Sequence, residues 1–581
     1  MASVLLPVSL LLAGLLLIPE VFGDFMAYQI GLYLIYGIAA QGIGYLWGKT
    51  GILPLGQALF FGVAAYTTAL TLRNIDSLPA QLGLAAVVML AIALLAYGLA
   101  ALIFKGRSES GPYFSLITLA LVMIAEQVAN TASGVTGGFN GLSGYSSLGG
   151  LDPYENFYYL VVGATVVVST GLLVLNRLPV NLVVKGVADN EPRLQLLGFA
   201  THRIKGCAFA FSAVIAGLAG GLFASHQGIV TPTSTGFGLS AELVILAAIG
   251  GRFHVLGPLI GAVLVGWASA ELRDSFPYWE IVMALGFILV VLKAPGGIAE
   301  LAAGIMTRSW RFGKTSGTSI TAAPISRATQ VPAPVIFDDV RLQIGVVRIL
   351  NGVSFETPAT GIVSIIGPNG AGKTSALNTI TGNLGVSSGH ISIGDKFVEG
   401  RAPHTALGNG IGRKLQVPSV FFSMSVTENL TLSMLAGRAR WRDLFRSSAF
   451  GWQSAALARV MGNAELSLAS DLSKTAGSLP QGHRQFLEFA MTTAAEPTLL
   501  LLDEPCAGLS PDETALMTRL VKEYQDKSGG LVIVIEHDMS IVEAISDKVL
   551  VLHQGQVLAF DSYAAVRANL HVQAVYAGAS K

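Results

Sequence analysis

A glycine-rich segment lies where a phosphate group could bind. Gly361–Ile366 is a β-rich apolar run, and it leads directly into the sequence Gly-Pro-Asn-Gly-Ala-Gly-Lys-Thr. This is GxxxxGK[ST] between an expected strand and an expected helix, the context that the motif requires. Its glycines let backbone N–H groups turn toward phosphate oxygens, and the helix N-terminus favours an anion. The expected nucleotide-binding residues are Gly367, Pro368, Asn369, Gly370, Ala371, Gly372, Lys373, Thr374 and Ser375.

Two acidic residues follow a second apolar strand. The run Thr498–Leu502 ends in Asp503 and Glu504, downstream of the phosphate loop. Lys373 is expected to reach the β- and γ-phosphates, while Thr374 and Asp503 are expected to ligate Mg²⁺. Glu504 would then polarise the attacking water. Together these residues predict an α/β P-loop domain that hydrolyses a nucleoside triphosphate.

The composition divides the chain into two domains. Of its 581 residues, 52% are hydrophobic and only 12% are charged, against roughly a quarter charged in soluble proteins. Residues 1–305 alternate apolar runs with short loops, residues 306–334 resemble a flexible linker, and residues 335–581 resemble a soluble enzyme. The net charge of +0 gives no field for nucleic acid, so no such partner is expected. Cys207 and Cys506 lie in different halves, which argues against a disulfide framework.

The first domain is expected to be all-α and to span a lipid bilayer many times. A crossing needs about 20 apolar residues. Apolar runs occur at residues 4–22, 26–47, 52–72, 80–104, 112–131, 157–176, 206–225, 240–250, 255–272 and 279–293. The run at 240–250 is short and could pair with 255–272 as a re-entrant unit. We therefore expect about eight to ten transmembrane helices. Met1–Val21 lacks the Lys and Arg of a signal peptide and is expected to be the first crossing.

Basic residues predict the orientation of these crossings. If both chain ends are cytoplasmic, only Arg73 and Arg273 lie outside. The residues then placed inside are Lys49, Lys105, Arg107, Arg177, Lys185, Arg193, Arg203, Lys205, Arg252 and Lys293. The nucleotide-binding domain accordingly lies in the cytoplasm. Near the outer end of one crossing, the polar residues Glu126, Gln127 and Asn130 could line a substrate path or bond to another subunit.

The longest inside loop, Arg177–Lys205, contains a predicted short helix at Glu191–Leu197. Asn190 is a good N-cap and Gly198 can end the helix. Its expected contact residues are Glu191, Leu194, Leu197 and Gly198, with Leu196 on the same apolar strip. Such a helix could dock into a groove on an ATPase and couple the two domains. The alternative is a solvated loop that basic residues hold against the lipid headgroups.

The order of the further motifs resembles the ATP-binding-cassette (ABC) family over the C-terminal half. Gln416 matches the glutamine loop, which contacts metal and water, and His537 matches the switch histidine. The signature motif corresponds to Leu479, Pro480, Gln481, Gly482 and His483, and the D-loop to Gly508, Leu509 and Ser510. The resemblance implies ATP and Mg²⁺ as cofactors, and Glu504, His537 and Gln416 as catalytic residues. The position that stacks on adenine falls near Val347 and Arg348, neither of which is aromatic.

The signature departs from the family pattern LSGGQ, whose serine contacts the γ-phosphate held by a partner ATPase. Pro480 replaces this serine and His483 replaces the glutamine. Loss of a hydrogen bond to a charged group costs about 1.5–3 kcal/mol. We hypothesise an asymmetric ATPase dimer, in which the site completed by Gly482 is the weaker of the two.

The first domain resembles the second permease of bacterial branched-chain amino acid importers, which also serve for urea and short-chain amides. The resemblance is carried by Leu53–Gln57, Gly111–Ser115, Thr136–Leu142 and Ala216–Gly221. It implies a multi-pass subunit of the cytoplasmic (inner) membrane that imports branched-chain or other hydrophobic amino acids. It also implies a hetero-oligomer with a second permease and a second ABC ATPase, which could also be fused, and a periplasmic substrate-binding protein.

Other functions remain open at this stage. The cargo could be urea or a short-chain amide, because substrate choice lies mostly in the binding protein. An ABC exporter would more often carry six long crossings, and an ATP-regulated channel would conduct without ATP hydrolysis. A cassette ATPase outside transport would lack the membrane domain.

Overall fold

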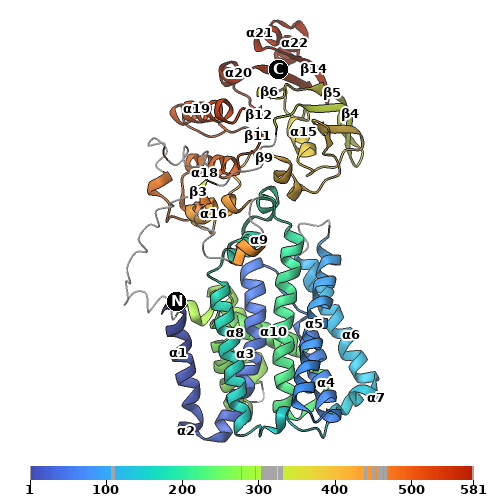
Figure 1. Ribbon diagram of the computed structural model, residues 1–581, viewed down its shortest axis with the longest axis vertical. Helices are drawn as coiled ribbons and strands as arrows, with labels where there is room; N and C mark the ends of the chain where they lie inside the picture. Colours follow the sequence, from blue (N-terminus) through green and yellow to red (C-terminus); the bar gives the residue numbers. More distant parts are fainter. Residues whose placement is uncertain are drawn as a thin grey trace. The chain divides into compact units, whose positions relative to one another are not determined.

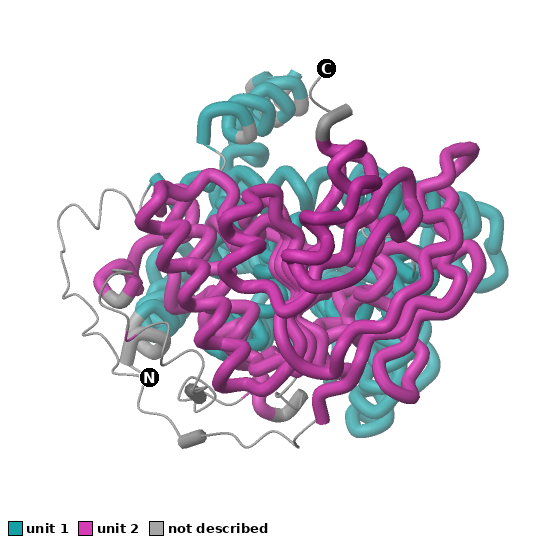
Figure 2. The backbone as a smooth tube through the Cα atoms, turned by 90° about the horizontal axis from the view of Figure 1, so that it is seen from above, with its two compact units in different colours: residues 1–188, 202–316 teal, residues 189–201, 317–581 magenta. Residues whose placement is uncertain are grey.

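The chain is described here from a computed structural model. The structure describes residues 2–105, 111–276, 278–294, 296–301, 323–324, 331–436, 441–445, 452–453, 462 and 468–578. The chain forms two compact units (Figure 2), one of Met1–Ala188 with His202–Ser316 and one of Asp189–Thr201 with Gly317–Lys581. A short internal segment, 189–201, thus belongs to the second unit. Of the expected linker 306–334, all but 323–324 and 331–334 lies outside the described residues.

The first unit is a bundle of helices (Figure 1). These are α1 (Ala2–Leu16), α2 (Ile18–Phe22), α3 (Asp24–Thr50), α4 (Gln57–Asn74), α5 (Leu78–Phe104), α6 (Gly111–Thr131), α7 (Ser133–Thr136), α8 (Asn156–Leu175), the first part of α9 (Pro179–Leu196), α10 (Thr201–Gln227), α11 (Phe237–Gly250), α12 (Gly257–Ser275) and α13 (Trp279–Lys293). Each apolar run expected from the sequence lies in this series. The first run is divided by a break between α1 and α2.

Length and apolar composition together identify fewer crossings than the sequence runs did. Among the described residues, 5 helices are long and apolar enough to cross a membrane, namely α3, α5, α6, α8 and α10. Shorter apolar helices cover Pro7–Phe22, Phe237–Gly250 and Gly257–Leu272. The total number of crossings stays a prediction.

Small residues bring α11 and α12 together. A Cβ atom on Gly261 would lie 2.3 Å from the carbonyl oxygen of Leu246, and one on Gly250 would lie 2.0 Å from that of Gly257. Only glycine allows this backbone approach. The runs 240–250 and 255–272 are therefore two closely packed helices, and their re-entrant arrangement stays a prediction. The loop expected at 134–150 carries short elements, among them β1 (Leu142–Ser143), which pairs antiparallel with β2 (Ile229–Val230).

The second unit contains a six-stranded sheet in the order β14-β13-β6-β12-β11-β9. Its strands are β6 (Gly361–Ile366), β9 (Ile411–Lys414), β11 (Leu499–Asp503), β12 (Leu531–Ile535), β13 (Lys548–His553) and β14 (Gln556–Asp561). All neighbours are parallel except β13 and β14. Every residue of β11 and β12 is buried, as expected of inner parallel strands whose two faces are covered.

The second unit also contains a four-stranded antiparallel sheet, whose strands precede and follow the phosphate loop in the sequence. It consists of β5 (Val347–Glu356), β4 (Val335–Ile344), β7 (Ser388–Ile393) and β8 (Lys396–Phe397), in that order. The two-residue strands β3 (Ala323–Pro324) and β10 (Trp452–Gln453) pair with each other. The helices of the unit are α15 (Lys373–Ile380), α16 (Val426–Leu435), α18 (Gln481–Thr493), α19 (Pro511–Ser528), α20 (Met539–Ile545), α21 (Tyr563–Ala568) and α22 (Leu570–Gly578).

The predicted short helix exists, but the loop before it does not. Helix α9 already begins at Pro179 and is interrupted at Asn190 (φ −156°, ψ 83°). The Asn190 side-chain oxygen accepts a hydrogen bond from the backbone N–H of Arg193 at 3.0 Å, the geometry of the expected N-cap. The helix ends where Gly198 adopts φ +89° and its N–H donates to the carbonyl of Gln195 at 2.8 Å. The stretch 180–188 is therefore helical instead of an open loop.

Candidate functional site

The phosphate loop follows β6 and takes the backbone shape that its glycines allow. Gly367, Gly370 and Gly372 have φ values of 151°, 80° and 97°, a region in which side chains are strained. There is also no room for a side chain at Gly367, because a Cβ there would lie 2.1 Å from the carbonyl oxygen of Leu552. Helix α15 starts at Lys373, so its free N–H groups face the loop. The predicted strand, loop and helix are all present.

Lys373 lies inside this loop. Its Nζ donates to the carbonyl oxygens of Gly367 at 2.8 Å and Pro368 at 3.0 Å. Burial lowers the pKa of Lys373, while the carboxylates of Glu504 and Asp503 act in the opposite direction. The ammonium group is thus held by backbone carbonyls at the N-terminus of α15. A phosphate oxygen can replace one of these carbonyls as its partner.

Asp503 and Thr374 meet beside the loop. The Thr374 hydroxyl lies 3.4 Å from Asp503 Oδ1, and Arg413 Nη2 lies 3.7 Å from Asp503 Oδ2. Burial raises the pKa of Asp503, and the Arg413 guanidinium opposes this rise. Within the described residues no hydrogen bond reaches the buried Oδ2 atom. A buried carboxylate oxygen left without a hydrogen bond, next to a hydroxyl, fits the oxygen ligands that Mg²⁺ requires.

Glu504 and His537 extend from the ends of neighbouring strands. Glu504 follows β11 with φ 45°, a strained value for a residue with a side chain, and its N–H donates to the carbonyl of Ile535 at 2.9 Å. This turn brings Glu504 Oε1 to 3.0 Å from His537 Nε2. The predicted catalytic acid and the predicted switch histidine therefore contact each other, beside the phosphate loop.

Glu536 was not singled out from the sequence, although it lies next to His537. It is buried, and its carboxylate accepts hydrogen bonds from the backbone N–H groups of Cys506 at 3.0 Å and His537 at 3.3 Å. Burial raises the pKa of Glu536, and those hydrogen bonds lower it. The side chain ties the turn after β11 to the turn after β12. The sequence signal was an acidic residue directly between an apolar run and the histidine, but its partner Cys506 could not be read from it.

The signature and D-loop segments pack against each other. Pro480 is the N-cap of α18 and provides no side-chain hydrogen bond to the helix. A Cβ on Gly482 would lie 2.2 Å from Glu513 Oε1, and that carboxylate also accepts from the N–H of Ser510 at 2.9 Å. Leu479 is buried, and His483 Nδ1 lies 3.4 Å from Asp471 Oδ2. Among the described residues, no side chain of the N-cap residue bonds to the first N–H groups of α18.

One predicted residue, Gln416, is not brought into the site. Gln416 lies two residues beyond β9 and is exposed, and among the described residues no hydrogen bond or ion pair joins it to Asp503 or Glu504. Near the expected adenine position, the Val347 side chain is exposed at the start of β5. In this part of the structure, nothing identifies the residue that would stack on adenine.

The segment 189–201 packs on the nucleotide-binding unit. Asp189 Oδ2 accepts from the N–H and hydroxyl of Ser423 at 2.9 and 2.8 Å, and Asn190 Nδ2 donates to Ser419 Oγ at 3.0 Å. Leu194 and Leu197, predicted as contact residues, are buried. The alternative of a solvated loop is wrong for this segment, because its apolar strip and its polar N-cap both have protein partners.

Arg193 is the largest difference from the sequence analysis, which grouped it with basic residues at the membrane surface. Its side chain is only 1% exposed. Its Nη1 atom donates to the carbonyl of Arg413 at 2.8 Å, and Nη2 donates to Thr492 Oγ1 at 2.9 Å. The carboxylate of Glu488, itself 0% exposed, lies 3.5 Å from Nη1. Positive charge alone could not distinguish a headgroup contact from a buried ion pair.

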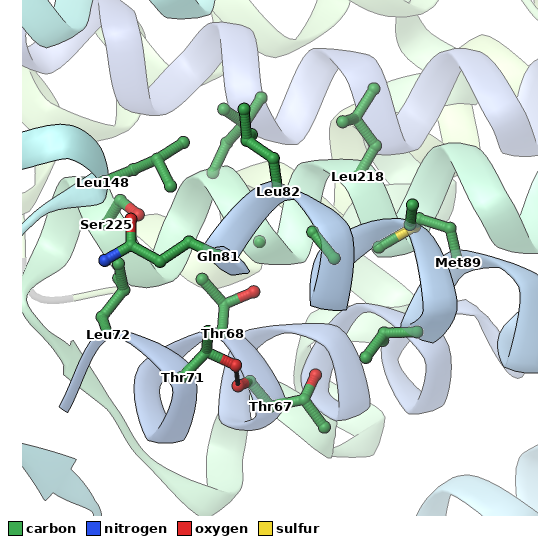
Figure 3. A pocket seen from close by; sticks show the side chains of 15 residues that line it. Thr67, Thr68, Thr71, Leu72, Gln81, Leu82, Met89, Leu148, Leu218 and Ser225 are labelled. Atoms are coloured by element: carbon green, nitrogen blue, oxygen red, sulfur yellow. Dashed lines mark hydrogen bonds between the residues drawn. The ribbon is translucent and has the colours of Figure 1, made fainter. Parts of the chain in front are cut away.

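The first unit contains a cavity of about 190 Å³ between α4, α5 and α10 (Figure 3). One end carries Gln81 and Ser225 beside Leu148, and the other end is lined by Met89 and Leu218. The buried oxygens Gln81 Oε1 and Ser225 Oγ have no hydrogen-bond partner among the described residues. The residues Glu126, Gln127 and Asn130, which the sequence suggested for a substrate path, do not line this cavity.

Known proteins match both units. A family model described as "Branched-chain amino acid transport system / permease component" matches residues 25–292, and one described as "ABC transporter" matches residues 350–507.

Individual relatives match one half of the chain each. The branched-chain amino acid transport ATP-binding protein LivG of Salmonella typhimurium is 34% identical over 41% of this chain and 94% of its own length. BraF of Pseudomonas aeruginosa, with a similar description, is 32% identical over the same shares. The permease protein LivM of Escherichia coli is 29% identical over 46% of this chain and 69% of its own length.

One solved structure, a nucleotide-free ATP-binding cassette from an ABC transporter, is 25% identical with a TM-score of 0.37 and covers 42% of this chain and 98% of its own. With a nucleotide site built from the matched motifs and a helical unit matched by the permease model, the chain belongs to the ABC transporter family of the branched-chain amino acid type, and it joins a permease and an ATPase in one polypeptide.

Proposed function

We propose that this chain uses ATP hydrolysis to import branched-chain or other hydrophobic amino acids across the cytoplasmic (inner) membrane. The observation that carries the hydrolytic part is the contact of Glu504 with His537 beside Lys373 and Asp503. The cargo is supported by the relatives, whose names describe ATPases and a permease of branched-chain amino acid transport. The ATPase unit is proposed to lie in the cytoplasm.

The residues of the site divide the chemical work. The phosphate loop and Lys373 bind the phosphates of ATP, and Thr374 and Asp503 hold Mg²⁺. When bound, Mg²⁺ neutralises charge on the β- and γ-phosphate oxygens. Glu504 accepts a hydrogen bond from the attacking water, and His537 fixes the orientation of the Glu504 carboxylate. Gln416 is proposed to join the metal and water only after the segment that follows β9 has moved.

A complete transporter requires further subunits. The N-terminus of α18, with Pro480 and Gly482, is proposed to complete the nucleotide site of a second ATPase, and that ATPase's signature would complete the site at Lys373. This chain supplies one permease and one ATPase, so a second permease, a second ATPase and a periplasmic substrate-binding protein are proposed partners. Because Pro480 has no hydroxyl, the site that this chain's signature completes is proposed to be the weaker.

The segment 189–201 is proposed to couple the two units. It is supported by the hydrogen bonds of Asp189 and Asn190 to Ser423 and Ser419 and by the burial of Leu194 and Leu197. The segment connects covalently to the first half of α9 and to α10. Movement of those helices therefore has a direct mechanical path into the ATPase unit.

The test is transport by the assembled complex. The chain is expressed with the products of neighbouring genes, reconstituted in vesicles, and supplied with labelled leucine or labelled urea. Leucine uptake that needs both ATP and the binding protein supports the proposal. Uptake of urea alone would assign the amide-type cargo, and flux without ATP would indicate a channel; either result contradicts the proposed function.

A further inference from the structure

Arg193 connects the docked segment to the interior of the ATPase unit. Its guanidinium donates to Arg413 O at 2.8 Å and to Thr492 Oγ1 at 2.9 Å, and Nη2 also donates to Glu488 O at 3.4 Å. These acceptors lie on β9 and α18. Removing a fully buried, paired arginine is costly, because its partner carboxylate then remains buried in the low-dielectric interior without a compensating charge.

Strand β9 is the edge of the six-stranded sheet and pairs only with β11. Among the described residues its other side has no neighbouring strand, and there the carbonyl of Arg413 accepts its hydrogen bond from Arg193. An edge strand is held less firmly than an inner one because half of its backbone groups lack strand partners. Arg193 therefore fixes a part of the sheet that would otherwise be free to shift.

The side chain of Arg413 reaches the metal-binding carboxylate. Its Nη1 donates to Thr381 Oγ1 at 2.9 Å, and Nη2 lies 3.7 Å from Asp503 Oδ2, with both side chains of this pair 1% exposed. Thr381 follows α15, the helix that begins with Lys373. One residue thus joins the peptide held by Arg193, the phosphate-loop helix and Asp503.

Glu488 balances the charge of Arg193 and Lys414 next to β9. It accepts from the N–H of Leu415 at 3.0 Å, and its two carboxylate oxygens lie 3.5 Å from Arg193 Nη1 and 3.7 Å from Lys414 Nζ. The stretch 413–415 is consequently clamped by Arg193 and Glu488 together. Gln416, the proposed metal and water contact, follows this clamp by one residue.

We propose that Arg193 is a positioning residue that sets the orientation of Asp503 for Mg²⁺, acting through the peptide and guanidinium of Arg413. The inference rests on the proposed function and deepens it, because it identifies how the docked segment would regulate the nucleotide site. Displacing 189–201 loosens the peptide of Arg413, and Asp503 then loses its fixed partner. By linkage, bound Mg²⁺ favours the docked position of the segment by the same factor.

The test measures metal-dependent nucleotide binding in the assembled complex, without turnover. A Glu504→Gln background retains ATP, and binding of a fluorescent ATP analogue is followed while Mg²⁺ is titrated and again in EDTA. Arg193→Gln should raise the Mg²⁺ concentration at half-saturation by about tenfold, in keeping with the loss of one charged hydrogen bond. Binding in EDTA should not change, because the phosphate loop is intact.

Control variants separate positioning from general damage. Arg177→Gln removes an exposed basic residue just before α9 and should leave the Mg²⁺ titration unchanged. Thr492→Val removes a single acceptor of Arg193 with little change of shape, so it should shift half-saturation by about twofold to threefold. If Arg193→Gln does not assemble, the Thr492→Val titration decides, and an unchanged midpoint overturns the proposal.

A double-mutant cycle tests the path itself. Arg193→Gln and Arg413→Lys should be non-additive in the Mg²⁺ midpoint, because the first acts through the second. Additive effects, or equal weakening in EDTA and in Mg²⁺, would contradict the proposal and leave Arg193 as an anchor only. If the wild-type complex imports leucine but Arg193→Gln does not shift the Mg²⁺ midpoint, this inference alone is refuted. Wild-type complex that does not transport refutes the proposed function instead.

Discussion

The Nε2 atom of His537 lies 3.0 Å from Oε1 of Glu504, and the two residues follow adjacent parallel strands, β12 and β11. This contact depends on the positive φ of Glu504 and on Glu536, which holds the N–H groups of Cys506 and His537. The carboxylate that is proposed to orient water is therefore held by the turn after β11 and by His537.

His537→Ala should remove one of these two constraints. We expect the ATP turnover of the assembled complex to fall by about 10²-fold, the lower range for loss of a positioned acid–base partner. Binding of the ATP analogue should stay within about twofold, since the phosphate loop does not use His537. Equal losses of binding and turnover would instead show that His537 supports the fold of the loop.

Pro480→Ser should restore two interactions at once. The N-cap of α18 has φ −55° and ψ 158° and no side-chain hydrogen bond, a geometry in which serine can cap. Stability should rise by about 1 kcal/mol, seen as a higher melting temperature of the chain. ATP turnover of the complex should also rise, because serine adds a donor to the partner's γ-phosphate. Unchanged turnover would count against the asymmetric dimer.

Gly482→Ala should disturb the contact between the signature and D-loop. The new Cβ would meet Glu513 Oε1, which the Ser510 cap needs. Gain in helix propensity, about 1 kcal/mol, offsets part of this clash, so the melting temperature should change little while turnover falls about tenfold or more. Combining it with Glu513→Ala should recover turnover relative to the single change; a further additive loss would show that Glu513 is not the cause.

Asp538 caps α20, the helix directly after His537. Its Oδ1 accepts from the N–H of Ser540 at 2.8 Å and from its hydroxyl at 2.6 Å, and these bonds lower the pKa of Asp538. Asp538→Ala should cost about 1 kcal/mol at neutral pH. Because the folded pKa lies below the unfolded one, this contribution is present above the unfolded pKa and is lost as pH falls through the folded value.

Thermal unfolding of the wild-type chain and of the Asp538→Ala variant over a pH series checks this sign. The two melting temperatures should converge on acidification below about pH 4, the ordinary range of an aspartate. A difference that grows as the pH falls would contradict the assignment of the cap.

Local motifs predicted much of the site. The phosphate loop needed only its glycines and the strand before it, and Asn190 acted as an N-cap because its side chain satisfies the N–H of Arg193. Such features depend on neighbours in sequence. The same holds for the apolar runs, which are largely helical, although the first is divided between α1 and α2.

Long-range partners could not be predicted from these patterns. Arg193 and Glu488 lie 295 residues apart, and nothing local in either segment shows that they pair in a buried site. Glu536 was hidden for a related reason, since its role depends on the turn at Cys506. Gln416 illustrates the reverse case: the motif identifies it, but its side chain is exposed away from the acids.

The most direct test of the account is ATP-driven leucine uptake by vesicles that contain the complete complex, with wild-type chain and with Glu504→Gln. The wild type should accumulate leucine only when ATP is on the side of the membrane that holds the ATPase unit and the binding protein is on the opposite side. Glu504→Gln should bind the ATP analogue normally and lose uptake and ATP turnover by about 10²-fold or more. Uptake at the wild-type rate by Glu504→Gln would contradict the account.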